Sequence, residues 1–158
     1  RTKYQENKVI LMDKLKIMKL SDFIKNQKIN IPIFMDKISA GFPSPASDYI
    51  ENNLDLNEYL ISHPAATFIV KANGSSMSNS HIQSGDLLIV DRSLTPKHNS
   101  IVIASIFGDL TVKQFKKKNG TMFLISTNSQ YPNFEVKEEM ECFIWGVVTY
   151  VIHSTIEK

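Results

Sequence analysis

Two residues of this sequence could together perform acyl-transfer chemistry, namely Ser76 and Lys113. Ser76 lies in Gly74-Ser75-Ser76-Met77, where glycine permits a tight turn that can expose a hydroxyl and aim backbone amides at one point. A serine hydroxyl is a weak nucleophile until a base takes its proton, and a lysine can act as that base only as a neutral amine. Burial can lower the pKa of a lysine from about 10.4 by up to ~3 to 5 units. A lysine in an apolar strand is therefore a candidate base.

The other residue types that often carry catalysis are interpreted as structural. Four histidines lie near loops or the terminus, and no signature links them to a nucleophile: His63, His81, His98 and His153. Asp86 and Asp91 flank an apolar strand, where carboxylates commonly end strand pairing, and Cys142 is interpreted as a small core side chain. No Cys/His spacing resembles a zinc site, so neither a metal nor a cofactor is expected. Most Gly-x-Ser turns are only turns and most strand lysines point to water, so these residues alone do not establish catalysis.

The second half of the chain has the pattern of a compact, mainly β domain. Apolar and β-branched runs bounded by turn residues predict strands over 67–70, 86–90, 100–107, 111–118, 121–125 and 143–152. Asn119-Gly120 supplies the positive φ angles of a type I′ hairpin turn between two of these runs. The hairpin places Lys113 inside a strand with Phe115, whereas the lysines at 116–118 lie near the turn and are poorer candidate bases.

The first third of the chain gives weaker signals. Residues 48–60 have roughly helical apolar spacing, weakened by Asn52-Asn53, and predict one short helix or turn. Ser21-Asp22 could cap a short helix that continues to Lys28, and the apolar run over 9–20 fits neither a helical nor a strand period. In Gly41-Phe42-Pro43-Ser44-Pro45 two prolines remove amide donors, which predicts an exposed linker. Exposed linkers are the segments that proteases cut.

Charge divides the chain at about the same place. Residues 1–40 carry nine basic and four acidic residues (+5), and residues 41–158 carry nine and twelve (−3), within a formal net charge of +2 over 158 residues. A basic arm on an acidic body suits an arm that meets nucleic acid or another polyanion, and it equally suits a solvated lysine-rich tail. With no apolar run near the ~18 residues of a membrane span and a single cysteine, the chain is expected to be a cytoplasmic protein without a membrane partner. It opens on Arg1 rather than methionine, so the natural protein can extend upstream.

Several segments together resemble the UmuD branch of the LexA/UmuD family of self-cleaving Ser/Lys peptidases. They are residues 41–49, the segment from Asp55 to Pro64, the Gly-x-Ser-Met turn, and residues 85–91, and the resemblance covers roughly 31–152. In this family a serine after the first strand and a lysine 37 positions later form the catalytic dyad, which implies Ser76 as nucleophile and Lys113 as base. The bond that the family cuts corresponds to Ala40-Gly41, where UmuD itself usually has cysteine at the first position and LexA-type repressors have alanine.

The resemblance implies a β core that folds a flexible N-terminal arm back over its own active site. The expected division is a basic, regulatory arm over 1–40, removed by cleavage and a candidate for DNA binding, and a peptidase and dimerisation core over 41–158. The expected partners are a RecA filament on single-stranded DNA, which stimulates cleavage, and a second copy of the chain.

The arm is longer and more basic than in short UmuD proteins, so we interpret the chain as an SOS regulator whose cleavage relieves repression through a DNA operator. The alternative is a UmuD-type subunit that cleavage activates for a UmuC-like error-prone translesion polymerase. No clear helix-turn-helix is visible in 1–40.

Overall fold

The computed structural model describes residues 16–19, 30–34 and 50–156. Its main feature is an eight-stranded sheet in the order β1-β4-β5-β10-β6-β7-β8-β9, in which every neighbouring pair is antiparallel. The strands are β1 (Lys16–Lys19), β4 (Thr67–Lys71), β5 (Leu87–Asp91), β6 (Ile101–Ile106), β7 (Asp109–Lys118), β8 (Thr121–Ile125), β9 (Phe134–Glu135) and β10 (Phe143–Ile152). A separate two-stranded sheet joins β2 (Asn30–Phe34) to β3 (Ile50–Asp55). The predicted mainly β fold is therefore confirmed.

Helical structure in the described residues is short and lies in the connections. The α-helix α2 (Leu56–Leu60) begins at Asp55, whose side chain accepts a hydrogen bond from the Asn57 amide, as an N-cap does. Single 3₁₀ turns follow at η2 (Pro64–Ala66), η3 (Ser78–Ser80) and η4 (Glu138–Met140). None of the helices in this part of the chain is long and apolar enough to cross a membrane.

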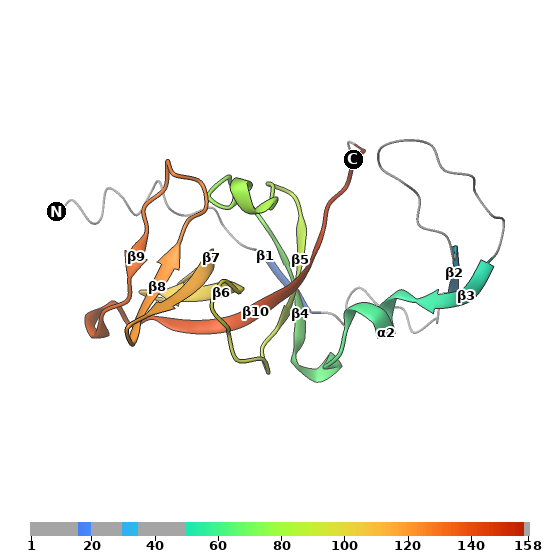
Figure 1. Cartoon of the computed structure of the whole chain (residues 1–158), viewed down its shortest axis with the longest axis horizontal. Coiled ribbons are helices and arrows are strands. Elements are labelled where there is room, and N and C mark those ends of the chain that lie inside the picture. Colours follow the sequence, from blue (N-terminus) through green and yellow to red (C-terminus); the bar gives the residue numbers. More distant parts are fainter. Residues whose placement is uncertain (1–15, 20–29, 35–49, 157–158) are drawn as a thin grey trace.

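The long strand β10 connects the two halves of the main sheet. Its first half pairs with β6 and its second half pairs with β5, and a register shift interrupts each pairing. Figure 1 shows β10 running from β6 past β5 to the C-terminal end of the chain. Because a bulge bends a strand and increases its twist, these irregularities let one strand belong to both halves.

Both faces of the central strands are buried, which explains their nearly continuous apolar sequences. Along β6, Ile103 belongs to one core cluster, whereas Val102, Ala104 and Ile106 belong to a second. The first cluster also contains Val70, Ala72, Met77, Ile82, Leu88, Val90 and Val112, and the second also contains Phe115, Leu124 and Val147. Alternate side chains of a strand point to opposite faces, so a strand with both faces covered must be apolar throughout.

All six strands predicted after residue 66 are present, and the hairpin is confirmed. Asn119 and Gly120 have φ angles of 50° and 83°, as a type I′ turn requires. The one short helix or turn predicted within 48–60 is present as α2, whereas residues 50–55 form β3, whose Leu54 pairs with Ile31 of β2. Pairing with a distant strand there overrides a weak helical period that contains two asparagines.

Two described strands lie within the segment predicted as the N-terminal arm. β1 pairs with β4, so that Lys16 lies opposite Lys71 and Lys19 lies opposite Phe68, and β2 pairs with β3. The arm therefore contributes an edge strand to the main sheet. The helix expected over 21–28 and the linker at 41–45 lie outside the described residues, and the division of the chain at residue 40 stays a prediction.

We expect Gly146→Ala to destabilise the junction between β10 and β5. A Cβ at this position would lie 2.6 Å from Val90 Cγ1, closer than two carbon atoms tolerate, and a tight 3.3 Å from Arg92 Cγ. The expected cost is about 1–3 kcal/mol of unfolding free energy, as for other overpacked cores. Denaturant unfolding of Gly146→Ala, Val90→Ala and the double variant measures it. The double variant should cost less than the sum of the single changes, and strict additivity would contradict the predicted clash.

Candidate active site

Ser76 lies in a turn directly after β4, as the sequence predicts. Gly74 has a φ of 95°, the left-handed conformation that glycine adopts readily, and the Ser78 amide donates to the carbonyl of Ser75. The next residue, Met77, is 3% exposed and belongs to the first core cluster. Ser76 itself is half-buried. A buried side chain therefore anchors the turn immediately beside the candidate nucleophile.

A second loop, residues 126–131, holds this turn in place. The Asn128 amide donates to the Ser76 carbonyl at 2.9 Å, and Asn128 Nδ2 donates to the Ser75 carbonyl at 3.0 Å. The Ser75 and Tyr131 hydroxyls are 3.0 Å apart and form a third contact. A loop about fifty residues downstream thus holds the turn through the backbone carbonyls of Ser75 and Ser76 and the hydroxyl of Ser75. No sequence signal indicates this role for Asn128.

Lys113 is buried in the middle of β7. It is 1% exposed and is the largest of the fully buried side chains of the described residues. Its strand partner is Val102, which is fully buried, and Phe115, two residues along the same strand, is 7% exposed. By contrast, Lys116 is half-buried and Lys117 and Lys118 are exposed. Lys113 is thus removed from water in a strand whose neighbouring residues include Val102 and Phe115.

The loop at 126–131 also lies next to Lys113. Gln114 pairs with Ile125 across β7 and β8, so continuing that register places Lys113 opposite Ser126, which is 5% exposed. Ser126 opens the loop that binds the Ser76 turn two residues later, through Asn128. The structure therefore brings the two predicted residues to the same end of β8. Ala40 and Gly41, the predicted cleavage site, lie outside the described residues.

Two of the four histidines form ion pairs with buried carboxylates, which the sequence did not indicate. His63 Nδ1 lies 2.6 Å from Asp91 Oδ2, and His153 Nδ1 lies 2.7 Å from Asp86 Oδ1. In both pairs the histidine is about half-exposed, whereas the carboxylate side chain is 4% or 3% exposed. The pairs span 28 and 67 residues of sequence, so no local pattern could reveal them. They fasten the two ends of β5 to segments beyond the sheet and support a structural role for both aspartates.

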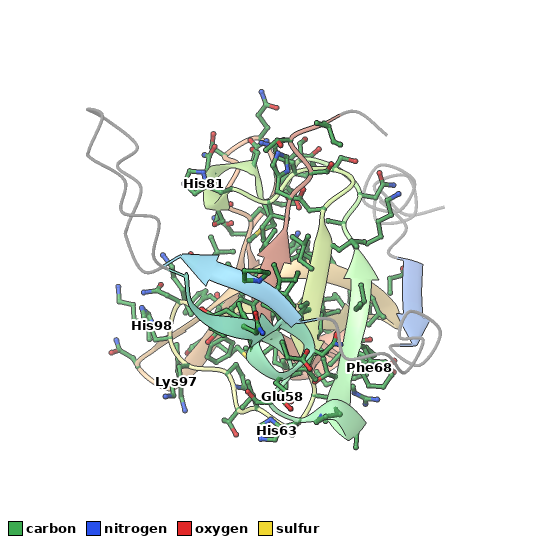
Figure 2. The ribbon with its side chains drawn as sticks, turned by 90° about the vertical axis from the view of Figure 1, so that its right-hand side faces the viewer. Glu58, His63, Phe68, His81, Lys97 and His98 are labelled. Atoms are coloured by element: carbon green, nitrogen blue, oxygen red, sulfur yellow. The ribbon has the colours of Figure 1, made fainter. Side chains whose placement is uncertain are left out.

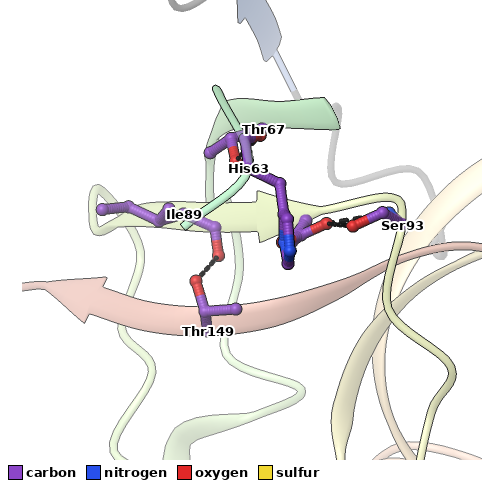
Figure 3. Close-up of polar contacts among 6 residues, drawn as sticks. His63, Thr67, Ile89, Ser93 and Thr149 are labelled. Atoms are coloured by element: carbon purple, nitrogen blue, oxygen red, sulfur yellow. Dashed lines mark hydrogen bonds and ion pairs between the residues drawn. The ribbon is translucent and has the colours of Figure 1, made fainter. Parts of the chain in front are cut away.

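Asp91 is the more heavily bonded of the two carboxylates. Burial by itself would raise its pKa, but hydrogen bonds from the Ser93 hydroxyl, from His63 and from the Ser93 amide, together with the charge of His63, hold the pKa below its ordinary value. Figure 3 shows His63, Thr67 and Ser93 together at this end of β5. A pocket of about 260 Å³ opens there, lined in part by His63, Asp91 and Tyr150.

Cys142 and the other potential metal ligands show no sign of a reactive centre. Burial raises the pKa of the Cys142 thiol, which packs beside the second core cluster. An inert thiol fits this position, because reactive cysteines have lowered pKa values. In residues 16–19, 30–34 and 50–156, no three His, Cys, Asp or Glu side chains lie close enough together to hold a metal ion.

Comparison with known proteins identifies the family. The family model described as Peptidase S24-like matches residues 32–149, which include part of β2, the Ser76 turn, Lys113 and most of β10. The chain belongs to the peptidase S24-like family. The family predicted from the sequence is thereby confirmed.

Named relatives in the peptidase S24-like family differ in how closely they match. Protein ImpA of Salmonella typhimurium is 48% identical over 126 residues, covering 80% of this chain and 86% of that protein. Protein MucA of Escherichia coli is 44% identical over 129 residues, covering 81% of this chain and 86% of MucA. The LexA repressor of Aliivibrio salmonicida is 28% identical over 137 residues, covering 86% of this chain and 65% of the repressor. The UmuD-like relatives are thus nearer to this chain than LexA is.

Asp91→Asn tests the lowered pKa of the carboxylate at the end of β5. A carboxylate whose pKa is lower in the folded state stabilises the fold above its unfolded pKa of about 3.9, and this contribution is lost as the pH falls through the folded pKa. We therefore expect the variant to lose about 1–3 kcal/mol at neutral pH, and expect the difference from wild type to shrink on acidification. Denaturant unfolding over a pH series measures this, with Asp109→Asn as the control for losing one negative charge. A difference that stays constant down to acid pH would contradict the assignment.

Proposed function

We propose that this chain cuts its own Ala40-Gly41 bond. Ser76 Oγ attacks the carbonyl carbon of Ala40 while Lys113 Nζ accepts the hydroxyl proton, and the proton then passes to the Gly41 nitrogen as that amine leaves. The resulting ester between Ser76 and Ala40 is hydrolysed by a water whose proton Lys113 accepts and then passes to Ser76 Oγ as the serine leaves. The observation that carries the proposal is the complete burial of Lys113 at the end of β8 where the Ser76 turn is bound.

The burial of Lys113 favours the protonation state that the reaction needs. Transfer from water to an apolar interior disfavours the charged form of an amine, and only the uncharged form can accept a proton from serine. The side chains of Val102 and Phe115 supply such an interior around Lys113. The lysines at 116–118 are more exposed than Lys113, so burial does not favour their neutral form in the same way.

The Ser76 turn offers donors for the negative charge that develops on the Ala40 carbonyl oxygen. Within the described part of the chain, the Ser76 and Met77 amides donate to no acceptor of the protein. Two such amides beside the nucleophile suit an oxyanion hole, whose donors stabilise the tetrahedral intermediate. We propose this role for them.

An intramolecular substrate makes a slow but switchable reaction possible. A well-oriented attached group reaches effective molarities of about 10⁵–10⁸ M, so the rate depends on how often the arm places its bond beside Ser76. We propose that a RecA filament on single-stranded DNA favours this arrangement, and that cleavage separates residues 1–40 from a core over 41–158. The core is proposed to form a homodimer through the end of β10, where Tyr150, Val151 and Ile152 are each about 40% exposed.

The masses of the cleavage products test the dyad and the bond at once. Purified wild-type protein incubated with RecA, nucleotide and single-stranded DNA should yield one fragment ending at Ala40 and one starting at Gly41. Ser76→Ala and Lys113→Ala should lower the rate by at least about 10³-fold, since removing a nucleophile or its base costs that much or more. Ser78→Ala, an exposed serine two residues away, is the matched control and should still cleave. Cleavage that persists in Ser76→Ala would overturn the assignment.

We propose that the cleaved protein acts as a UmuD-type subunit of a UmuC-like translesion polymerase in the SOS response. This alternative from the sequence is better supported than the repressor interpretation, because the UmuD-like relatives reach 44–48% identity and LexA reaches 28%. The excess of basic residues in 1–40, which favoured a regulator, is compatible with either function.

Two binding measurements separate the polymerase subunit from the regulator. The cleaved protein should co-purify with a Y-family polymerase of the UmuC type, and the intact Ser76→Ala protein should bind promoter DNA of damage-inducible genes no better than unrelated duplex. Preferential binding to one operator, with no polymerase retained, would support the regulator instead.

A further inference from the structure

Five basic side chains gather at one end of the main sheet. Three are the consecutive lysines that end β7, Lys116, Lys117 and Lys118, and two are Lys97 and His98 in the segment before β6. All are exposed except the half-buried Lys116. We call this set the basic hairpin end. Figure 2 shows Lys97 and His98 projecting from the same side of the molecule.

Backbone contacts fix the two parts of the basic hairpin end together. The Asn99 amide donates to the Phe115 carbonyl, and the Phe115 amide donates to the Ser100 carbonyl, each at 2.8 Å. His98 Nδ1 lies 3.2 Å from both the amide nitrogen and the carbonyl oxygen of Lys117. Depending on its tautomer, the ring accepts from the amide or donates to the carbonyl. The positive charges are therefore held near one another.

The four lysines of this set have no carboxylate partner in the described residues. The ion pairs found there join His63 to Asp91 and His153 to Asp86. The strand register brings one acidic residue, Glu135, towards these lysines. Glu135 pairs with Phe123, which in turn pairs with Lys116. Glu135 is therefore two strands away from Lys116, and their backbones are about 10 Å apart. The lysines consequently repel one another without an internal counter-charge.

This arrangement departs from the charge of the rest of the core. Residues 41–158 carry nine basic and twelve acidic residues, and four of those nine are lysines of the basic hairpin end. Without these four, the same region has five basic and twelve acidic residues, a balance of −7. A polyanion would therefore be repelled by most of the core and attracted to this end, which orients its approach.

We propose that the basic hairpin end binds the phosphate backbone of DNA without reading its sequence. Lysine ammonium groups are point charges on flexible stems, which suit a row of phosphates better than one shaped ligand. Several such charges on one protruding hairpin can follow successive phosphates, and release of counterions then drives binding. This inference requires no cleavage, so it stands or falls separately from the Ser76 and Lys113 assignment.

Salt-dependent binding of DNA by the full chain tests the proposal. We would use Ser76→Ala as the parent, to keep the chain intact, and measure anisotropy of a labelled single strand and of the matching duplex. Each phosphate contact contributes about −0.9 to the slope of log K against log salt on duplex and about −0.7 on a single strand. Replacing the lysines at 116–118 by glutamine should therefore reduce the slope by about 2.7 or about 2.1, and weaken binding at low salt by at least about tenfold.

Single substitutions separate a local site from a general effect of charge. Lys118→Gln should weaken binding, whereas Lys71→Gln, an exposed lysine at the end of β4, should leave it within about twofold. Loss on one form of DNA only would identify that form as the ligand. A triple variant that is folded by circular dichroism and keeps the parent's slope on both forms would overturn the proposal, as would equal losses in Lys118→Gln and Lys71→Gln. An acidic protein partner would then be the better occupant.

Discussion

Burying the amine of Lys113 is the constraint on which the rest of the structure depends. A charged amine removed from water costs several kcal/mol, so a lysine at 1% exposure must either be compensated as a cation or be held neutral. The strand that carries this side chain lies between β6 and β8, and Lys113 pairs with Val102, a member of the second core cluster. Such a position lowers stability relative to an apolar residue, and a site that needs a neutral base gives a functional reason for it.

The surrounding architecture holds the Ser76 turn at the end of β8. Met77 anchors the turn in the first core cluster, and Asn128 binds it from the loop that follows β8. The strand β10 joins the two halves of the sheet, so the half that carries the turn and the half that carries the lysine cannot separate without breaking it. Gly146 of β10 and Val90 of β5 approach each other closely where these two strands pair. In the proposed mechanism, rigid placement of both groups leaves the arm as the part whose arrangement controls the reaction.

Much of the core and of the candidate site could be predicted because the relevant signals are local. Runs of apolar residues predict the strands from β4 onward, Asn119-Gly120 predicts the hairpin, and Gly74 predicts the turn before Ser76. Pairing between distant segments was not predictable: β1 and β2 are short, and β3 has a misleading helical period. The contacts of Asn128 with the Ser76 turn and of His63 with Asp91 join residues far apart in sequence. Only the resemblance to a family linked Ser76 to Lys113, since composition and spacing alone left the pair undecided.

The dependence of the self-cleavage rate on pH tests the central claim most directly. If Lys113 is the base, the rate without RecA should rise as the pH increases from about 7 to 10, because a growing fraction of the amine is neutral. Lys113→Arg is the sharpest comparison, since it keeps a long cationic side chain that does not lose its proton in this range, and it should not cleave at any of these pH values. A wild-type rate that is flat over the range, or a Lys113→Arg variant that cleaves as wild type does, would contradict the account.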